Sequence, residues 1–240
     1  MKKTLLILLT QLSLTLGLSA QTQQELRDSV SMISKLIEEH PKAVNLYMRK
    51  AALYVELNQW EKARDEYSTV LEMMPSHLGA LYYRGFVNQH LGRSSFARRD
   101  YETLLLLEPL HQNGMIGLII VNLSEGKTTQ AFDLANRLVE ASPTVSAVYS
   151  TRADVELHAQ QLSAAADDIE RAIALEEPVA KGKYPLTEDD AMTNYQLAAA
   201  NIYLKQEHWS QARRALDYLL AAGVSYTYLA DYYTLLRNKK

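Results

Sequence analysis

The sequence predicts an all-α protein, an α-solenoid of stacked antiparallel helix pairs, and three observations lead to this prediction. Four prolines recur with a period of 34 residues: Pro41, Pro75, Pro109 and Pro143. Four alanines recur with the same period: Ala63, Ala97, Ala131 and Ala165. The 9 glycines and 6 prolines in 240 residues leave little material for the many turns of an all-β protein. Two residue types that share one period indicate an internal repeat.

The N-terminus differs from the rest of the chain. Lys2 and Lys3 precede an apolar run over residues 5–18, and the small residue Ala20 follows it. This pattern predicts a signal peptide over residues 1–20, cleaved after Ala20 or after Ser19. An uncleaved membrane anchor is the alternative, because the run is near the lower length limit for a span. If cleavage occurs, the mature chain is exported to the periplasm or secreted, with no stable membrane insertion.

The repeats begin after a short helical segment. Ser29, Ile33 and Leu36 fall in phase with the second half of a repeat that ends at Pro41, so residues 22–41 are predicted to be a half-repeat. Farther on, apolar residues recur at spacings of three and four, as on one face of a helix. Full repeats are predicted at 44–77, 78–111, 112–145 and 146–178.

Within each repeat a short break separates two helices, and proline closes the unit because it cannot supply the next helical N–H. Hydroxyl side chains near the start of the second helices are predicted N-caps: Ser94, Ser95, Thr128, Ser163 and Ser210.

The fifth repeat is displaced along the chain. Ala212 follows Ala165 by 47 residues, and a segment rich in proline and glycine, predicted as a loop over residues 178–190, accounts for the shift. The fifth repeat is then predicted at 193–224. An amphipathic helix at 226–238 is predicted to cap the stack, because each unit of a solenoid buries its face only on a neighbour.

The residues inside the repeats resemble those of the tetratricopeptide repeat (TPR) family. The first helices pair a bulky residue with a small one: Tyr47 with Ala51, Leu81 with Gly85, and Tyr149 with Ala153. The second helices carry an alanine, a large residue and an aliphatic or small one: Ala63-Tyr67-Val70, Ala97-Tyr101-Leu104 and Ala165-Ile169-Ala172. Small residues permit two helices to cross closely. The resemblance implies a TPR superhelix, although the third repeat departs from the pattern at Ile119 and Ala135.

Charge and composition exclude several functions. A formal net charge of -3 argues against a nucleic-acid partner, which would require clustered excess positive charge. The local cluster of Arg93, Arg98 and Arg99 is interpreted as a solvated helix face. The chain has no cysteine, its six histidines form no metal-ligand motif, and no phosphate loop or nucleophile turn appears. We therefore predict no enzymatic activity, no catalytic residue, no metal and no cofactor.

The resemblance implies that partners, as peptides or helices, lie in a concave groove formed by the first helices of successive repeats. Ten groove positions are predicted by carrying over the family pattern: Met48, Arg49, Tyr82, Tyr83, Phe86, Gln89, His90, Ile116, Ile120 and Asp154. Five of them would form an apolar patch: Tyr82, Tyr83, Phe86, Ile116 and Ile120. The alternative is that some of these side chains pack against the neighbouring repeat. Arg49 alone suits a clamp for a C-terminal carboxylate, so that binding mode is rejected.

The sequence therefore predicts a non-catalytic scaffold or adaptor that binds other proteins in the bacterial cell envelope. The alternative is a structural subunit of an outer-membrane or secretion assembly that docks through its C-terminal helix, in which four tyrosines gather: Tyr226, Tyr228, Tyr232 and Tyr233.

Overall fold

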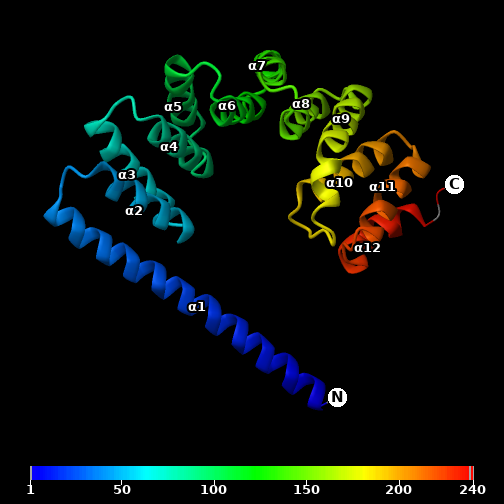
Figure 1. Ribbon diagram of the computed structural model, residues 1–240, viewed down its shortest axis with the longest axis horizontal. Coiled ribbons are helices and arrows are strands. Elements are labelled where there is room, and N and C mark those ends of the chain that lie inside the picture. The colour runs from blue at the N-terminus through cyan, green and yellow to red at the C-terminus, as the bar shows by residue number, and fades with distance from the viewer. Residues whose placement is uncertain (1, 238, 240) are drawn as a thin grey trace. The chain divides into compact units, whose positions relative to one another are not determined.

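A computed structural model of the protein describes the backbone of residues 2–237 and 239 and the side chains of residues 21–237 and 239. Within these residues the structure is all-α, as predicted, with twelve helices and no strand (Figure 1). The chain divides into two compact units, Met1–Gly117 (the first unit) and Leu118–Lys240 (the second unit). The division falls inside the sixth helix, α6 (Gln112–Ser124).

The first unit contains the long N-terminal helix and two antiparallel helix pairs. Its helices before α6 are α1 (Lys2–Glu39), α2 (Val44–Glu56), α3 (Trp60–Met73), α4 (Leu78–His90) and α5 (Ser94–Leu107). α2 packs on α3 and α4 packs on α5, while α3 also packs on α4 and joins the two pairs. α1 packs on α2, where Ile33 is buried.

The second unit continues the same arrangement. Its helices after α6 are α7 (Thr128–Ala141), α8 (Ser146–His158), α9 (Leu162–Lys181), α10 (Ala191–Lys205), α11 (Trp209–Ala221) and α12 (Tyr226–Leu236). α8 pairs with α9 and α10 pairs with α11, and the contacts of α7 with α8 and of α9 with α10 join successive pairs. α12 packs on α11 at the end of the stack.

The alanine ladder explains why the helices approach closely. The repeating alanines of the second helices are fully buried: Ala63, Ala97, Ala131, Ala165 and Ala212. Large side chains beside them, such as Tyr67 and Tyr101, are buried as well. A methyl group at the crossing point lets two helices meet, and the large neighbours then fill the flanking space.

The turns between the two helices of a pair use a left-handed residue at one fixed place. The residues with positive φ there are Asn58, Gly92, Gly126, Gln160 and Glu207. Only glycine adopts this conformation without steric cost, so the three side-chain-bearing residues carry backbone strain.

The predicted serine and threonine N-caps are wrong. The residues that cap the second helices are Gln59, Arg93, Lys127, Gln161 and His208, and none of them caps through its side chain. Each of these helices begins two residues after the left-handed residue of its turn, so Ser94 and Thr128 already lie inside the first helical turn. Side-chain caps occur at the start of two first helices, α4 and α6. There His77 Nδ1 accepts a hydrogen bond from Ala80 N, and His111 Nδ1 accepts one from Gly114 N.

Two predicted segments differ from the helices of the structure. α9 continues through Pro178 to Lys181, so the loop predicted from residue 178 begins later. Pro178 cannot donate a helical hydrogen bond, which costs stability at this point of α9. The burial of Ala180 in the core that contains Leu186 and Met192 offsets this cost and favours the extra turn. The helix predicted at 226–238 ends at Leu236, and residue 238 lies outside the described residues.

The signal-peptide prediction depends on residue 1 and on the side chains of residues 2–20, which lie outside the described part of the chain. In the backbone, residues 2–20 continue into the predicted half-repeat as one helix, α1. In the part of the chain that the structure describes, no helix has both the length and the apolar character needed to cross a membrane.

Candidate functional site

Half of the predicted groove residues lie on α4 in the first unit, and their exposure differs. The side chain of Tyr83 is 45% exposed and His90 is exposed, whereas Tyr82, Phe86 and Gln89 are half-buried. The helical spacing placed these residues on α4 correctly, but it did not show how much of each side chain the neighbouring helices cover.

Tyr82 and Phe86 pack against different neighbours. The Tyr82 ring lies 6.3 Å from the ring of Tyr101 and 6.0 Å from that of His111, measured between centroids. The Phe86 ring lies 6.3 Å from the ring of Trp60 in the preceding pair, in an edge-to-face arrangement. Phe86 thus packs between repeats, which was the alternative to exposure in the groove, whereas these contacts of Tyr82 lie within its own repeat. Burial raises the pKa of the Tyr82 hydroxyl above its ordinary value.

Gln89 is held by two hydrogen bonds within the first unit. Its Nε2 donates to the carbonyl of Gly117 at 3.4 Å, and its Oε1 accepts from the Tyr101 hydroxyl. Burial is the main cause that raises the pKa of Tyr101. The amide of Gln89 therefore connects α4 to α5 and to α6.

Tyr83 is the most accessible aromatic side chain on this face of α4. Its ring stacks on the buried Tyr67 ring with centroids 5.7 Å apart and an angle of 15° between the planes. The buried Tyr67 ring fixes the position of the exposed Tyr83 ring. The Tyr83 side chain therefore loses little conformational entropy when a partner binds to it.

The remaining predicted groove residues of the first unit lie on α2 and α6. Arg49 is exposed on α2, and Met48 is half-buried and packs against two clusters of the hydrophobic core. Ile116 is half-buried on α6. Ile120, with 52% of its side chain exposed, and Asp154, which is exposed on α8, belong to the second unit.

A polar cavity in the first unit was not predicted from the sequence. This arginine pocket has a volume of about 540 Å³ and lies among α3, α4 and α5. Four arginines line it: Arg64, Arg84, Arg93 and Arg99. The other lining residues are Ser68, Asn88, Phe96 and Asp100. Arg93 and Arg99 of the arginine cluster noted in the sequence line this cavity, and Arg99 is exposed on α5.

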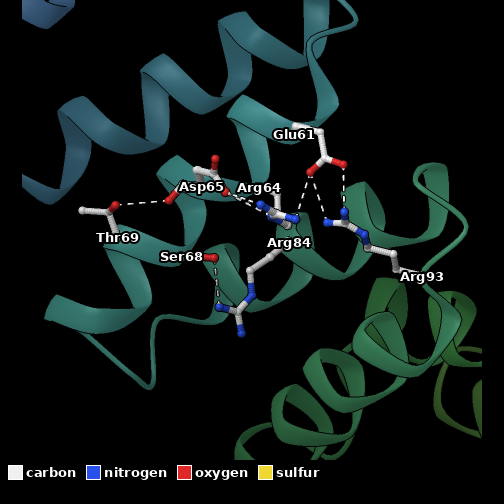
Figure 2. A network of polar contacts seen from close by, with 7 residues as sticks. All are labelled: Glu61, Arg64, Asp65, Ser68, Thr69, Arg84 and Arg93. Carbon is white, nitrogen blue, oxygen red and sulfur yellow. Dashed lines mark hydrogen bonds and ion pairs between the residues drawn. The ribbon is translucent and has the colours of Figure 1, made fainter.

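Ion pairs fix the position of three of the four arginines. Arg84 donates to the buried carboxylate of Asp100 through Nε at 3.0 Å and Nη2 at 2.6 Å, and Nη1 donates to Ser68 Oγ at 3.3 Å. Glu61 lies between Arg64 and Arg93 and pairs with both, each across 2.9 Å (Figure 2).

The second unit carries a related group of residues 68 positions later. Arg152 donates to Asp168 through Nε at 2.6 Å and Nη2 at 2.8 Å, and to Asn136 through Nη1 at 3.2 Å. Arg152, Asp168 and Asn136 correspond to Arg84, Asp100 and Ser68. This shared spacing of an arginine and an aspartate is visible in the sequence, and it is the signal that could have identified the group.

Among the described residues, no three histidine, aspartate or glutamate side chains lie together in a way that could hold a metal ion.

Known proteins share a repeat motif and the fold with this chain. Residues 14–77 match the family model described as tetratricopeptide repeat. A tetratricopeptide repeat protein from Parabacteroides merdae ATCC 43184 is similar, with 22% identity, a TM-score of 0.66 and coverage of 91% of this chain and 80% of that one. No curated protein matches the chain significantly.

Two further solved structures share the fold. PilW, a widely conserved type IV pilus biogenesis factor, has 17% identity and a TM-score of 0.68, with 86% of this chain and 90% of PilW covered. YrrB, a TPR protein with an unusual peptide-binding site, has 19% identity and a TM-score of 0.54, with 80% of this chain and 92% of YrrB covered.

Proposed function

We propose that this chain is a tetratricopeptide repeat protein and acts as a non-catalytic scaffold, which binds a peptide or a helix of another protein on the first helices of its repeats. The exposed Tyr83 ring on α4, stacked on the buried Tyr67, is the observation that carries this proposal. Aromatic residues held in place by buried neighbours are enriched among the residues that dominate binding energy.

The second unit offers a comparable apolar residue on a first helix. Ile120 on α6 leaves 52% of its side chain exposed although the side chains before and after it, Ile119 and Val121, are buried. Tyr83 and Ile120 are the large hydrophobic residues most exposed on the first helices of described repeats. The peptide-binding site of the similarly folded YrrB supports recognition of a peptide as the mode of binding.

We place this scaffold in the bacterial cell envelope. The basic residues Lys2 and Lys3, the apolar run and the small residue Ala20 support export. A mature chain without cysteine cannot form wrong disulfides in an oxidising compartment. The fold shared with the pilus biogenesis factor PilW is compatible with an assembly role there.

Site-specific photo-cross-linking in the native host tests the binding surface. A photo-reactive benzoyl-phenylalanine replaces Tyr83 in one variant and Ile120 in another, and mass spectrometry identifies what is captured. A third variant carries the same group in place of Asp133, which is exposed on the second helix α7 and serves as the matched control.

The proposal expects the first two positions to capture one and the same protein and the control position not to capture it. Capture of that protein from Asp133 alone, or of unrelated proteins from the two test positions, would contradict binding on the first helices.

The C-terminal helix favours a second candidate function, docking into a larger assembly. Tyr232 accepts a hydrogen bond from Asn201, and the Tyr233 hydroxyl donates to Asp217 at 2.7 Å, so these two tyrosines hold α12 on the stack. Tyr226 and Tyr228 remain 57% and 39% exposed. Tyr228→Ser should abolish self-association in light scattering if this end docks, and should leave it unchanged if α12 is only a cap.

A further inference from the structure

We propose that the arginine pocket of the first unit is a second binding site, which takes a carboxylate-bearing segment of a partner protein. The site lies among α3, α4 and α5 and contains none of the predicted groove residues. It therefore goes beyond the proposed binding on the first helices, and either site can exist without the other.

The charges that line the cavity are unequal. Four guanidinium groups face one carboxylate, that of Asp100, which Arg84 neutralises in a bidentate pair and which is only 3% exposed. Glu61 pairs with Arg64 and Arg93, and Asp65 pairs with Arg64; neither carboxylate is among the residues that line the cavity. The interior of the pocket thus presents hydrogen-bond donors, and an anion is the complementary ligand.

Arg99 is the group that remains for this ligand. It is exposed at the wall of the cavity, and among the described residues its side chain has no hydrogen-bond or ion-pair partner, while its backbone carbonyl accepts from Thr103. A guanidinium presents its donors as a planar fork that matches a carboxylate in two parallel hydrogen bonds. Arg64, Arg84 and Arg93 hold their own ion pairs and contribute a positive field.

An apolar wall favours a peptide over a free anion. Phe96, also in the lining, leaves 60% of its side chain exposed beside the arginines. A second hollow of about 350 Å³ shares Ser68, Arg84, Arg99 and Asp100 with the pocket. Its further lining includes the carboxylate of Glu72 and the buried Leu71 and Leu81. The pocket therefore offers cationic groups next to the exposed Phe96 ring, which suits a chain segment that carries both acidic and apolar side chains.

Fluorescence anisotropy with a defined probe tests the proposal on the full chain. The probe is a fluorescein-labelled peptide that alternates glutamate and leucine, and the matched probe has glutamine in place of glutamate. We expect the glutamate peptide to bind more tightly, with an affinity that falls as salt is added. Equal binding of the two peptides would overturn the proposal.

Two variants and one control locate the binding. Arg99→Ala should weaken the binding of the glutamate peptide about tenfold, which is the loss of affinity expected for one charge-assisted hydrogen-bonded pair. Phe96→Ala should weaken it as well. Lys42→Ala removes an exposed, unpartnered positive charge between α1 and α2 and should leave the affinity unchanged. Because Arg99 and Phe96 are exposed, both variants should keep the wild-type circular-dichroism melt.

Competition distinguishes a protein segment from a small anion. Inorganic phosphate should displace the peptide only at concentrations far above the peptide's dissociation constant, because phosphate makes no apolar contact with Phe96. Displacement at comparable concentrations, or Arg99→Ala binding the peptide like the wild type, would contradict the proposal.

Discussion

Glu156 follows Asn88 by 68 residues, and both side chains lie beside the aspartate of an arginine–aspartate pair. Asn88 Nδ2 donates to Asp100 Oδ2 at 3.1 Å. Glu156 instead places a second carboxyl group near Asp168, and it is only 7% exposed. Burial first, and then the negative charge of Asp168, raise the pKa of Glu156 to about 7.

This pKa makes the stability of the second unit depend on pH. In the folded chain the carboxyl group of Glu156 stays protonated up to a pH of about 7, whereas in the unfolded chain it titrates near the ordinary glutamate value of 4.5. Between these two pH values the folded form therefore binds more protons than the unfolded form. The stabilisation that comes from the raised pKa of Glu156 is complete below about pH 4.5 and is lost as the pH rises through about 7.

Replacing Glu156 with glutamine should remove this dependence. Glu156→Gln keeps a neutral donor beside Asp168, so we expect roughly 1–3 kcal/mol of added stability at pH 8 and almost none at pH 4. Urea unfolding at both pH values measures the difference. Asp133→Asn, at an exposed site of the same unit, is the control and should change neither value; an equal gain at both pH values for Glu156→Gln would contradict the account.

The converse substitution should create the same behaviour in the first unit. Asn88→Glu puts a buried carboxyl group beside Asp100, where Asn88 now donates its hydrogen bond. We expect this variant to unfold more easily at pH 8 than at pH 5, because an ionised Glu would face the negative charge of Asp100. Thermal melts at the two pH values check this. A loss of stability that is the same at both pH values would point to steric disruption alone.

Gly117 should not tolerate a side chain. A Cβ atom there would lie 2.4 Å from Tyr101 Cζ, and Tyr101 is only 1% exposed and cannot move away. Gly117→Ala should cost about 1–3 kcal/mol in chemical unfolding, as overpacking does. The double variant with Tyr101→Leu should lose less than the sum of the two single losses, because the smaller side chain makes room.

Gly182 is the matched site for this prediction. It has ordinary helical φ and ψ, and the nearest atom that a Cβ would meet is the Val179 carbonyl oxygen at 3.5 Å. Gly182→Ala should unfold like the wild type. A similar loss of stability from both glycine substitutions would show that the contact with Tyr101 is not the cause.

The strained turn at Gln160 should be improved by glycine. Gln160 has φ 61°, while the corresponding turns earlier in the chain use Gly92 and Gly126. Relief of left-handed strain should outweigh the greater freedom of glycine in the unfolded chain, for a net gain of about 0.5–1 kcal/mol. Gly92→Ala, where no atom lies within 4 Å of the added Cβ, should cost a similar amount from the backbone alone. Differential scanning calorimetry measures both.

The helical architecture could be predicted because its cause is local and repeated. α2, α4 and α8 begin at Val44, Leu78 and Ser146, the first residues of three predicted repeats. The spacing of small and large residues within a helix pair is a property of neighbouring turns, and one chain shows it several times.

The candidate sites depended on contacts that periodicity does not reveal. Tyr82 and Phe86 share one face of α4, but Tyr101 and Trp60 on other helices determine how far each is buried. The arginine pocket joins residues of α3, α4 and α5 that no single helical pattern connects. For the same reason a Phe86→Asp substitution would disturb the packing on Trp60 as well as any binding, and Tyr83 is the better position for a test.

The affinity of the Tyr83→Ala variant for the protein captured by cross-linking tests the central claim most directly. Titration calorimetry should show binding weakened about tenfold or more, as expected for a dominant interface aromatic, with unchanged helical content. Tyr228→Ala, on α12, should bind like the wild type. Unchanged affinity for Tyr83→Ala, or a loss seen only with Tyr228→Ala, would contradict binding on the first helices of the repeats.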